Sequence, residues 1–210
     1  FSPTKRCFKG YGYDRLKDEY DVELVDINED DHEMLEISNN VKVRVSKLML
    51  DPKNYLISAA VLKTHDNVVA TLSLKNLVMG AIIKREVNDK AKMHQGIKEI
   101  NYDIFRLAKK LKPDISVIDG FEGMEGNGPN SGDPVDSRLA IASADFLAAD
   151  RIGLEVMGID ASKVGYLNYC YDKGMGEYDL EKIKILGNKI LECRKKYRLH
   201  NTVGEQYKWH

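Results

Sequence analysis

The sequence has little cysteine, and none of it forms a cluster motif. Three cysteines occur in 210 residues, Cys7, Cys170 and Cys193, and no two of them form a Cys-x-x-Cys pair. Cysteines this isolated are typical of reduced thiols in a cytosolic protein, rather than of disulfides or an iron–sulfur cluster. We therefore expect a cytoplasmic location and predict no iron–sulfur cluster in this chain.

An excess of charge of one sign is also absent. The 32 basic and 33 acidic residues give a net charge of −1, and no basic block stands out, so nucleic-acid binding has no electrostatic basis. No apolar run approaches the roughly 18 residues that a membrane span requires, and no signal peptide is present, so we expect no membrane partner. The sequence also lacks an initiator methionine, which suggests a processed or cut piece of a longer protein.

Two common phosphate-binding motifs are missing, but a glycine-rich segment stands where such a motif would lie. No Gly-Lys-Ser/Thr occurs, and the pattern Gly-x-Gly-x-x-Gly is not met. Five glycines nevertheless fall between residues 119 and 132, directly after the apolar run 115–118. Because glycine lets backbone amides approach a ligand closely, such a loop can cradle an anion.

The same segment carries the carboxylates Asp119, Glu122 and Glu125. We expect Gly126 and Gly128 to donate backbone N–H groups to a ligand, and Asp119 or Glu122 to orient a histidine or hold a cation. The structural alternative is a long turn whose carboxylates face solvent.

A second polar constellation lies inside apolar sequence. It comprises Lys63, Thr64, His65, Thr71, Lys75 and Asn76. Lysines and hydroxyls can bind a carboxylate or phosphate, and an imidazole can shuttle protons near neutral pH. His94 precedes an expected helix and is a second candidate for proton transfer. The alternative is that the lysines extend from a helix edge to solvent while His65 ends a strand.

Hydrophobic periodicity predicts an α/β fold in one domain over residues 1–210. We expect strands at 22–27, 41–45, 55–62, 115–118 and 183–186. We expect helices at 95–111, from a cap at Asp145 or Ser143 to about Met157, and a short one capped by Asp179. Periodicity does not decide between helix and strand for 71–83. We expect residues 191–210 to form a loosely held tail.

The continuous apolar run 55–62 is typical of a strand covered on both faces. The sheet is therefore expected to be mixed but mostly parallel, with helices on both faces and a ligand crevice beyond the carboxyl ends of its strands. The 63–76 segment and the 119–129 loop, each following such a strand, are expected to open on that crevice.

An ordered series of motifs resembles a known family. It runs from Lys63-Thr-His65 and Thr71-Leu-Ser-Leu-Lys-Asn-Leu77 through Met93-His-Gln-Gly-Ile97, Glu125-Gly-Asn-Gly-Pro129, Ala142-Ser-Ala-Asp145 and Gly158-Ile-Asp160 to Gly174-x-Gly176. This series is similar to the family called domain of unknown function 362 over roughly residues 5–190.

The resemblance implies an uncharacterised domain that often stands beside ferredoxin-type cysteine motifs. It also implies a remote likeness to the amino-terminal domain of lactate-racemase-like proteins. Members usually carry a further amino-terminal section before the position of Phe1, so the resemblance implies that this section is missing here.

Three hypotheses of function follow. The leading one is an enzyme-like domain that binds a small anionic ligand between the 63–76 segment and the 119–129 loop, with Lys63 and Lys75 neutralising its charge. The second is a binding or scaffold module that docks to a redox partner. The third is a divalent-cation site built from Asp119, Glu122 and Glu125. The reaction, the cofactor and the oligomeric state are not specified by the sequence.

Overall fold

The computed structural model describes residues 3–210. Its β-strands are β1 (His32–Glu36), β2 (Lys42–Ser46), β3 (Ile57–Thr64), β4 (Ala70–Thr71), β5 (Ile115–Glu125) and β6 (Asp133–Ser143). Its α-helices are α1 (Thr4–Gly10), α2 (Leu16–Glu19), α3 (Lys47–Leu50), α4 (Ser73–Ala81), α5 (Ile97–Ala108), α6 (Phe146–Met157), α7 (Gly165–Asp172), α8 (Ile190–Cys193) and α9 (Val203–Gln206).

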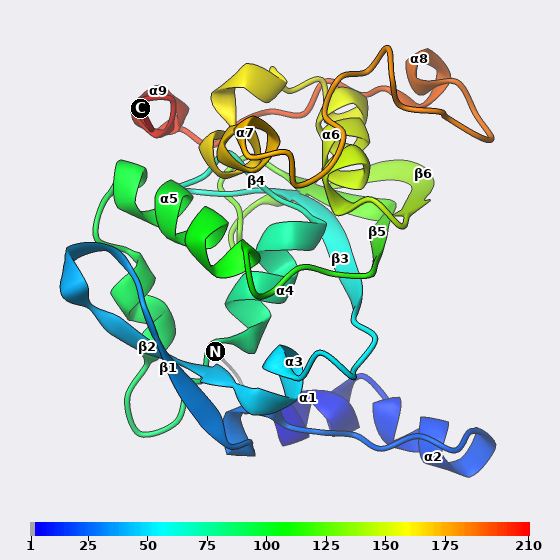
Figure 1. Cartoon of the computed structure of the whole chain (residues 1–210). Helices are drawn as coiled ribbons and strands as arrows, with labels where there is room; N and C mark the ends of the chain where they lie inside the picture. Colours follow the sequence, from blue (N-terminus) through cyan, green and yellow to red (C-terminus); the bar gives the residue numbers. More distant parts are fainter. Residues whose placement is uncertain (1–2) are drawn as a thin grey trace.

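A four-stranded mixed sheet forms the centre of the molecule, in the order β4-β3-β5-β6 (Figure 1). This confirms the predicted α/β class. The balance of strand directions differs from the expectation of a mostly parallel sheet, because β3 and β5 are parallel whereas β3–β4 and β5–β6 are antiparallel. The cause lies after residue 118, where the chain continues as strand to Glu125 and returns as β6.

Helices α4 and α6 pack against one face of the sheet, with α5 and α7 in contact beyond them. The expectation of helices on both faces is wrong for β3, whose side chains alternate between buried and exposed. Ile57 is 59% exposed and Val61 is 45% exposed, so the apolar run of this strand is half outside the core. A continuous apolar sequence does not distinguish a doubly covered strand from one with an apolar outer surface.

The two longest predicted helices are confirmed. The apolar side of α5 buries Ile100, Ile104 and Leu107. At the start of α6 the Asp145 carboxylate accepts hydrogen bonds from the backbone N–H groups of Leu147 and Ala148, and Gly158 ends the helix with φ of 68°. These are the cap residues that favour a helix start and a left-handed helix end.

Several other elements differ from prediction. Residues 22–26 and 183–186 lie outside any strand, and no helix follows Asp179, because neither apolar run pairs with the sheet. The undecided segment 71–83 is the short strand β4 followed by α4. The alternating strand at 41–45 is confirmed as β2, which pairs with β1.

The carboxyl-terminal segment is anchored to the rest of the protein at a few points, although most of its residues are exposed and we expected a loosely held tail. Tyr197 and Gln206 are buried, and the backbone N–H of Tyr197 donates to the carbonyl oxygen of Met157. Arg198 contacts Glu125 at the end of β5. The segment has no apolar periodicity long enough to be detected in the sequence. Individual contacts attach it to the rest of the protein instead.

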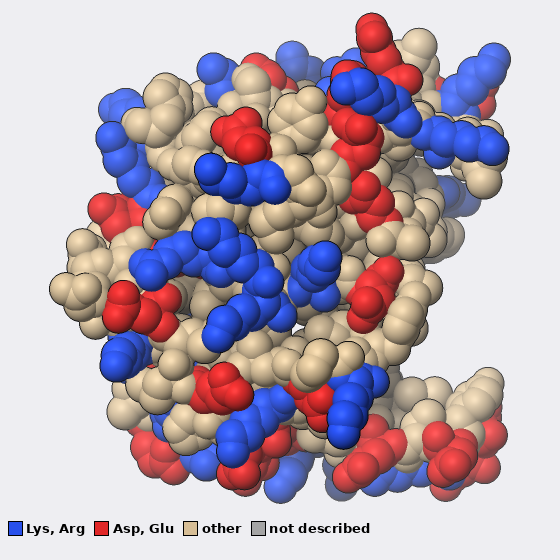
Figure 2. All heavy atoms as spheres, viewed as in Figure 1, with Lys and Arg blue, Asp and Glu red and all other residues tan. Residues whose placement is uncertain are grey.

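None of the helices within residues 3–210 has the length and hydropathy needed to cross a lipid bilayer. Acidic and basic side chains are scattered among uncharged ones over the face seen in Figure 2, in keeping with the near-zero net charge, and several basic side chains gather near its centre. The amino-terminal segment containing α1 and α2 projects from the body at the lower edge of both views.

Candidate functional site

A buried lysine–histidine pair lies where β3 ends. The chain leaves β3 at Thr64, turns through His65, returns as β4 and enters α4, so Lys75 in the first turn of α4 reaches back to His65. Lys75 Nζ lies 2.9 Å from His65 Nε2. His65 is 4% exposed and Lys75 is 5% exposed, so both side chains are almost withdrawn from water.

The start of α4 is fixed by a second buried group. The carboxylate of Asp150 in α6 accepts hydrogen bonds from the backbone N–H groups of Ser73 (2.8 Å) and Leu74 (3.1 Å). Burial raises the pKa of Asp150 to about 7, against the effect of these two donors. A carboxylate at a helix amino terminus stabilises the exposed N–H groups there, and this anchor positions Lys75 one residue further along.

The imidazole of His65 has partners on both ring nitrogens. Its Nδ1 lies 2.9 Å from Asp66 Oδ1 and 3.0 Å from the backbone N of Asn67. With the proton on Nδ1, the ring donates to Asp66 and Nε2 accepts from Lys75. With the proton on Nε2, the ring accepts from the Asn67 N–H and donates to a neutral Lys75 amine. The surroundings therefore support both tautomers, which is what a proton relay requires.

Burial shapes the charge states of this pair. Desolvation, together with repulsion from Lys75 and His94 and against the attraction of Asp66, lowers the pKa of His65 to about 4. Desolvation and repulsion from Lys63 lower the pKa of Lys75 to about 7. The hydrogen bond from His65 holds the pKa of Asp66 below its usual range. At neutral pH the imidazole is therefore uncharged, and a large fraction of Lys75 is a neutral amine.

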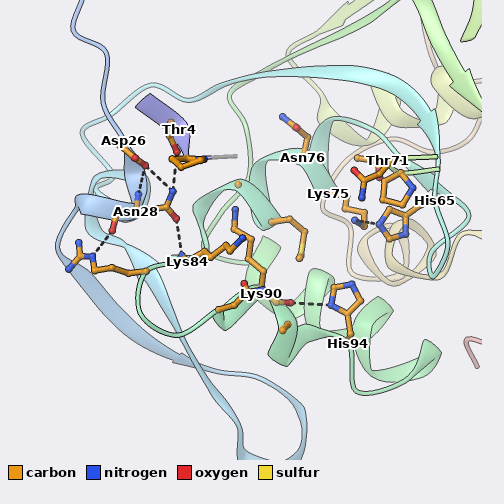
Figure 3. Close-up of a pocket in the computed structure, with 18 of the residues that line it drawn as sticks. Thr4, Asp26, Asn28, His65, Thr71, Lys75, Asn76, Lys84, Lys90 and His94 are labelled. Carbon is orange, nitrogen blue, oxygen red and sulfur yellow. Dashed lines mark hydrogen bonds between the residues drawn. The ribbon is translucent and has the colours of Figure 1, made fainter. Parts of the chain in front are cut away.

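This pair faces a cavity of about 1010 Å³ between the end of β3, α4, the 3-10 helix Asp89–Met93 and the amino-terminal segment. His65, Thr71 and Lys75 lie at one end and Thr4, Asp26 and Asn28 at the other, with Lys84 and Lys90 between them (Figure 3). Its charged lining consists of the basic residues Lys63, Lys75, Lys84, Arg85 and Lys90 and the acidic residues Asp26, Glu29 and Asp66. Positive charge is therefore in excess locally, although the whole chain is nearly neutral.

Thr71 adds a polar group with an unused bonding capacity. Its side chain is 7% exposed and lines the cavity, and its Oγ1 has no hydrogen-bond partner among residues 3–210. Most buried hydroxyls are hydrogen-bonded, because an unpartnered buried polar atom is costly. An orphaned hydroxyl beside a basic cavity is therefore an indication of a ligand-binding position.

Unlike Thr71, the other predicted residues of the 63–76 segment have hydrogen-bond partners within the protein. Lys63 lines the cavity with its Nζ 3.5 Å from the carbonyl oxygen of Pro129, and burial lowers its pKa. Thr64 donates to the carbonyl oxygen of Gly126 at 2.9 Å, which joins β3 to the glycine-rich segment. Asn76 donates to the Ala59 carbonyl oxygen and the Ser58 hydroxyl, so its amide ties α4 to β3 at the cavity rim.

His94 also reaches the cavity, from the carboxyl end of the 3-10 helix Asp89–Met93. It is exposed, and its Nδ1 lies 3.1 Å from the carbonyl oxygen of Lys90. In Figure 3 its ring lies on the same side of the cavity as His65. The structure thus brings together Lys63, His65, Thr71, Lys75, Asn76 and His94.

The glycine-rich segment is not the open loop expected from its composition. Asp119 and Glu122 lie in β5 with exposed side chains, outside the cavity lining. Gly126 packs against Arg198 and Gly128 against the Thr64 backbone, where a β-carbon on Gly128 would lie 2.3 Å from the Thr64 carbonyl oxygen. From this segment it is Pro129 and Asn130 that reach the cavity.

The hypothesis of a divalent-cation site on Asp119, Glu122 and Glu125 is not supported. Glu125 forms an ion pair with Arg198 and accepts a hydrogen bond from its backbone N–H. Within residues 3–210, no group of three or more His, Cys, Asp or Glu side chains is arranged to hold a metal ion. Strand alternation and pairing with the carboxyl-terminal segment separate carboxylates that are close in sequence.

The sequence analysis did not predict the cavity residues that lie outside the 63–76 segment and His94. Lys84, Arg85 and Lys90 follow α4 in a short basic stretch, which was the available signal. Burial, with repulsion from Lys84 and against attraction from Asp26, lowers the pKa of Lys90. No comparable sequence pattern marks Thr4, Asp26 and Asn28. Their position at the cavity depends on how the amino-terminal segment folds against the rest of the protein.

Comparison with known proteins identifies a family and a relative whose names state no activity. The family model described as "Domain of unknown function (DUF362)" matches residues 1–155. A thylakoid-associated protein of Synechocystis sp. is 29% identical over 122 residues, which cover 58% of this chain and 38% of that protein. The aligned region thus spans well under half of this relative. No solved structure matches the chain.

Proposed function

Since the chain belongs to the DUF362 family, whose description names no activity, we propose a function from the cavity itself: it binds a small anionic molecule and moves a proton to or from it. The ligand would carry a carboxylate or phosphate group. The observation that carries this proposal is the buried His65–Lys75 contact of 2.9 Å at the wall of a basic cavity.

Charge complementarity supports the anion. Lys63 and Lys90 are partly desolvated cations in the cavity lining, and a bound anion would relieve the cost that burial imposes on each. Thr71 would give its unpartnered hydroxyl to the same group. Charges in a cavity shielded from water interact more strongly than on an open surface.

The proton step would use the chain Asp66–His65–Lys75. A neutral Lys75 amine accepts a proton from the ligand, or the ammonium form donates one, while the imidazole adjusts its tautomer between Lys75 and Asp66. A group that titrates near the working pH is well matched to such general acid–base work. His94 is the second candidate for proton transfer, on the exposed side of the cavity.

The test is a thermal-shift screen of small carboxylates, phosphates and mononucleotides, followed by calorimetric titration of each stabilising compound. A ligand that binds only the folded state raises the stability by about 2.7 kcal/mol at a hundredfold excess over its dissociation constant. We expect Lys63→Gln and Thr71→Val to lower the affinity at least tenfold. The matched control is Lys98→Gln, since Lys98 is exposed on α5 and lies outside the cavity lining.

Anions that stabilise wild type and both cavity variants equally would contradict this site. A complete lack of stabilisation in a well-folded sample would favour the alternative, a module that docks to a redox partner. One observation favours that alternative, namely the exposed apolar side chains Tyr55, Ile57, Val61 and Phe121 on and beside the sheet.

We also propose a cytoplasmic location. Cys7, Cys170 and Cys193 are free thiols in the structure, which fits a reducing compartment. Titration of thiols in the denatured protein, purified without reductant, should find all three reduced. A finding of one disulfide in protein isolated from its native cell would contradict the proposal.

A further inference from the structure

Lys75 combines three properties that a nucleophilic amine needs. Its side chain lines the cavity and is almost withdrawn from water, and its amine is held by a hydrogen bond to a neutral imidazole, so three conditions meet at one residue. Lysines in proteins become nucleophiles when they are desolvated or lie beside another cation, because both effects favour the neutral amine. Lys75 meets both conditions, with Lys63 as the neighbouring cation.

We propose that Lys75 forms an imine with the carbonyl group of a small carbonyl-bearing acid, so that the ligand class of this cavity is an aldehyde or keto acid. This inference rests on the proposed anion site and specifies it further. It assigns Lys75 a covalent role in place of the charge-neutralising role that the sequence suggests, and leaves the acid group of the ligand to Lys63 and Lys90 on the cavity walls.

The condensation balances without an oxidant or reductant. The Nζ lone pair attacks the carbonyl carbon, and the carbonyl oxygen takes up a proton to give a carbinolamine. The nitrogen then loses its second proton, the carbon–oxygen bond breaks, and both amine protons leave with the oxygen as one water molecule. His65 Nε2, 2.9 Å from Nζ, is the base that accepts a proton from the nitrogen and returns it to the departing hydroxyl.

The surrounding groups fit the step. His65 faces Asp66 on its other nitrogen, so a positive charge that develops on the ring during proton transfer is stabilised. Thr71 can donate its free hydroxyl to the carbonyl oxygen or the acid group. Lys63 and His94 are the remaining charged or titratable groups near the pair, and both act against a second positive charge there.

The experiment is reductive trapping on the full chain. The protein is incubated at pH 7 with glyoxylate or pyruvate and sodium cyanoborohydride, and adducts are assigned by peptide mass spectrometry. We expect Lys75 to be modified at least tenfold faster than any exposed lysine, such as Lys98, because exposed lysines are almost fully protonated at this pH. Phosphate or lactate, which lack a reactive carbonyl, should slow the reaction at Lys75 and leave exposed lysines unaffected.

Lys75→Arg keeps a long nitrogen-bearing side chain but cannot form an imine, so the fast adduct should disappear. Lys98→Arg is the matched control and should retain it. If Lys75→Arg does not fold, the protection of wild-type Lys75 by phosphate or lactate still tests whether the fast adduct forms in the cavity, without a substitution.

Adducts spread over exposed lysines with no preference for Lys75 would overturn the imine, and so would preferential reaction at Lys63. In either case, thermal stabilisation by phosphate or lactate tests the proposed anion site independently of the imine. Stabilisation without trapping leaves the anion site standing and removes only the covalent role. Absence of both removes the anion site and the imine together.

Discussion

The side chains at the end of β3 show how single residues set the chemistry of this protein. Lys75 is placed where its charge is least favourable, and its amine hydrogen-bonds to an imidazole that is itself kept neutral by burial. Thr71, a few residues earlier, is left with a bonding capacity that no residue between 3 and 210 fills. Both features cost stability, and costs of this kind are concentrated at binding sites.

Lys75 should leave a signature in the pH dependence of stability. Its pKa falls from 10.5 to about 7 on folding, so between these values the unfolded state binds the extra proton and wild-type stability rises with pH. Each pKa unit corresponds to about 1.4 kcal/mol. In Lys75→Met this contribution is absent, and the stability of wild type relative to the variant should therefore increase by a few kcal/mol from pH 7 to pH 10.

Urea unfolding of both proteins across this range provides the measurement. His65, with a pKa of about 4, and Asp66, with a pKa below its usual range, do not titrate between pH 7 and pH 10, and Lys63 is present in both proteins. A difference that is constant with pH would show that Lys75 is fully protonated in the folded protein.

Two threonines give a matched pair of substitutions with opposite expected signs. Thr71→Val removes an unpartnered buried hydroxyl and should raise stability by roughly 1 kcal/mol. Thr64→Val removes a hydrogen bond of 2.9 Å to the Gly126 carbonyl oxygen and should lower stability by a similar amount. Thermal unfolding should separate the two variants by several degrees, and a loss of stability in Thr71→Val would mean that its hydroxyl has a partner within the protein.

At the scale of elements, one carboxylate both caps the start of α6 and joins this helix to a neighbouring segment. Asp145 Oδ1 accepts from two N–H groups of the first turn, and Oδ2 accepts from the Glu177 N–H at 2.8 Å. Asp145→Ala should therefore cost about 2 kcal/mol, the sum of a lost cap and a lost hydrogen bond. Asp145→Asn keeps the capping oxygen and should lose less than half of this in the same denaturation experiment; equal losses would argue against capping.

The elements also show where sequence reasoning succeeds and fails. Helices α5 and α6 were predictable because their periodicity and caps are local properties of the chain. That Lys63, His65, Lys75 and Asn76 line one cavity was predictable, because polar residues interrupt an apolar run at the end of a strand; whether they bind a ligand stays a prediction. The hairpin of β5 and β6 was not predictable from the sequence. The five glycines favour the prediction of a loop, whereas pairing between the two strands holds the backbone extended as far as Glu125.

For the whole molecule, the site is completed by contacts that are distant in sequence. Val69, in the turn after His65, has φ of 68°, an unfavourable value for a β-branched residue. Its backbone N–H donates to Gln206 Oε1 at 2.7 Å, across 137 positions in the chain. No local pattern reports such a contact, which is why the carboxyl-terminal segment was expected to be loose.

Gln206→Ala tests this long-range support. The Val69 N–H would lose its partner in a buried position, which costs about 1–3 kcal/mol, and the melting temperature should fall by several degrees. Glu205→Ala is the control, since Glu205 is exposed on the same helix and pairs only with Lys208 in the described chain. Equal melting temperatures for the two variants would show that the carboxyl-terminal segment does not support the turn.

The hydrogen bond between Val69 and Gln206 also has a consequence for synthesis. On the ribosome, residues 63–75 emerge long before Gln206, so the turn that carries His65 is made without its distant support. During this interval Lys75 remains solvated and protonated, as any lysine in an unfolded chain would be. The contact between Val69 and Gln206 would therefore form only when the segment around Gln206 docks, so the turn that carries His65 would be among the later parts of residues 3–210 to reach its final form.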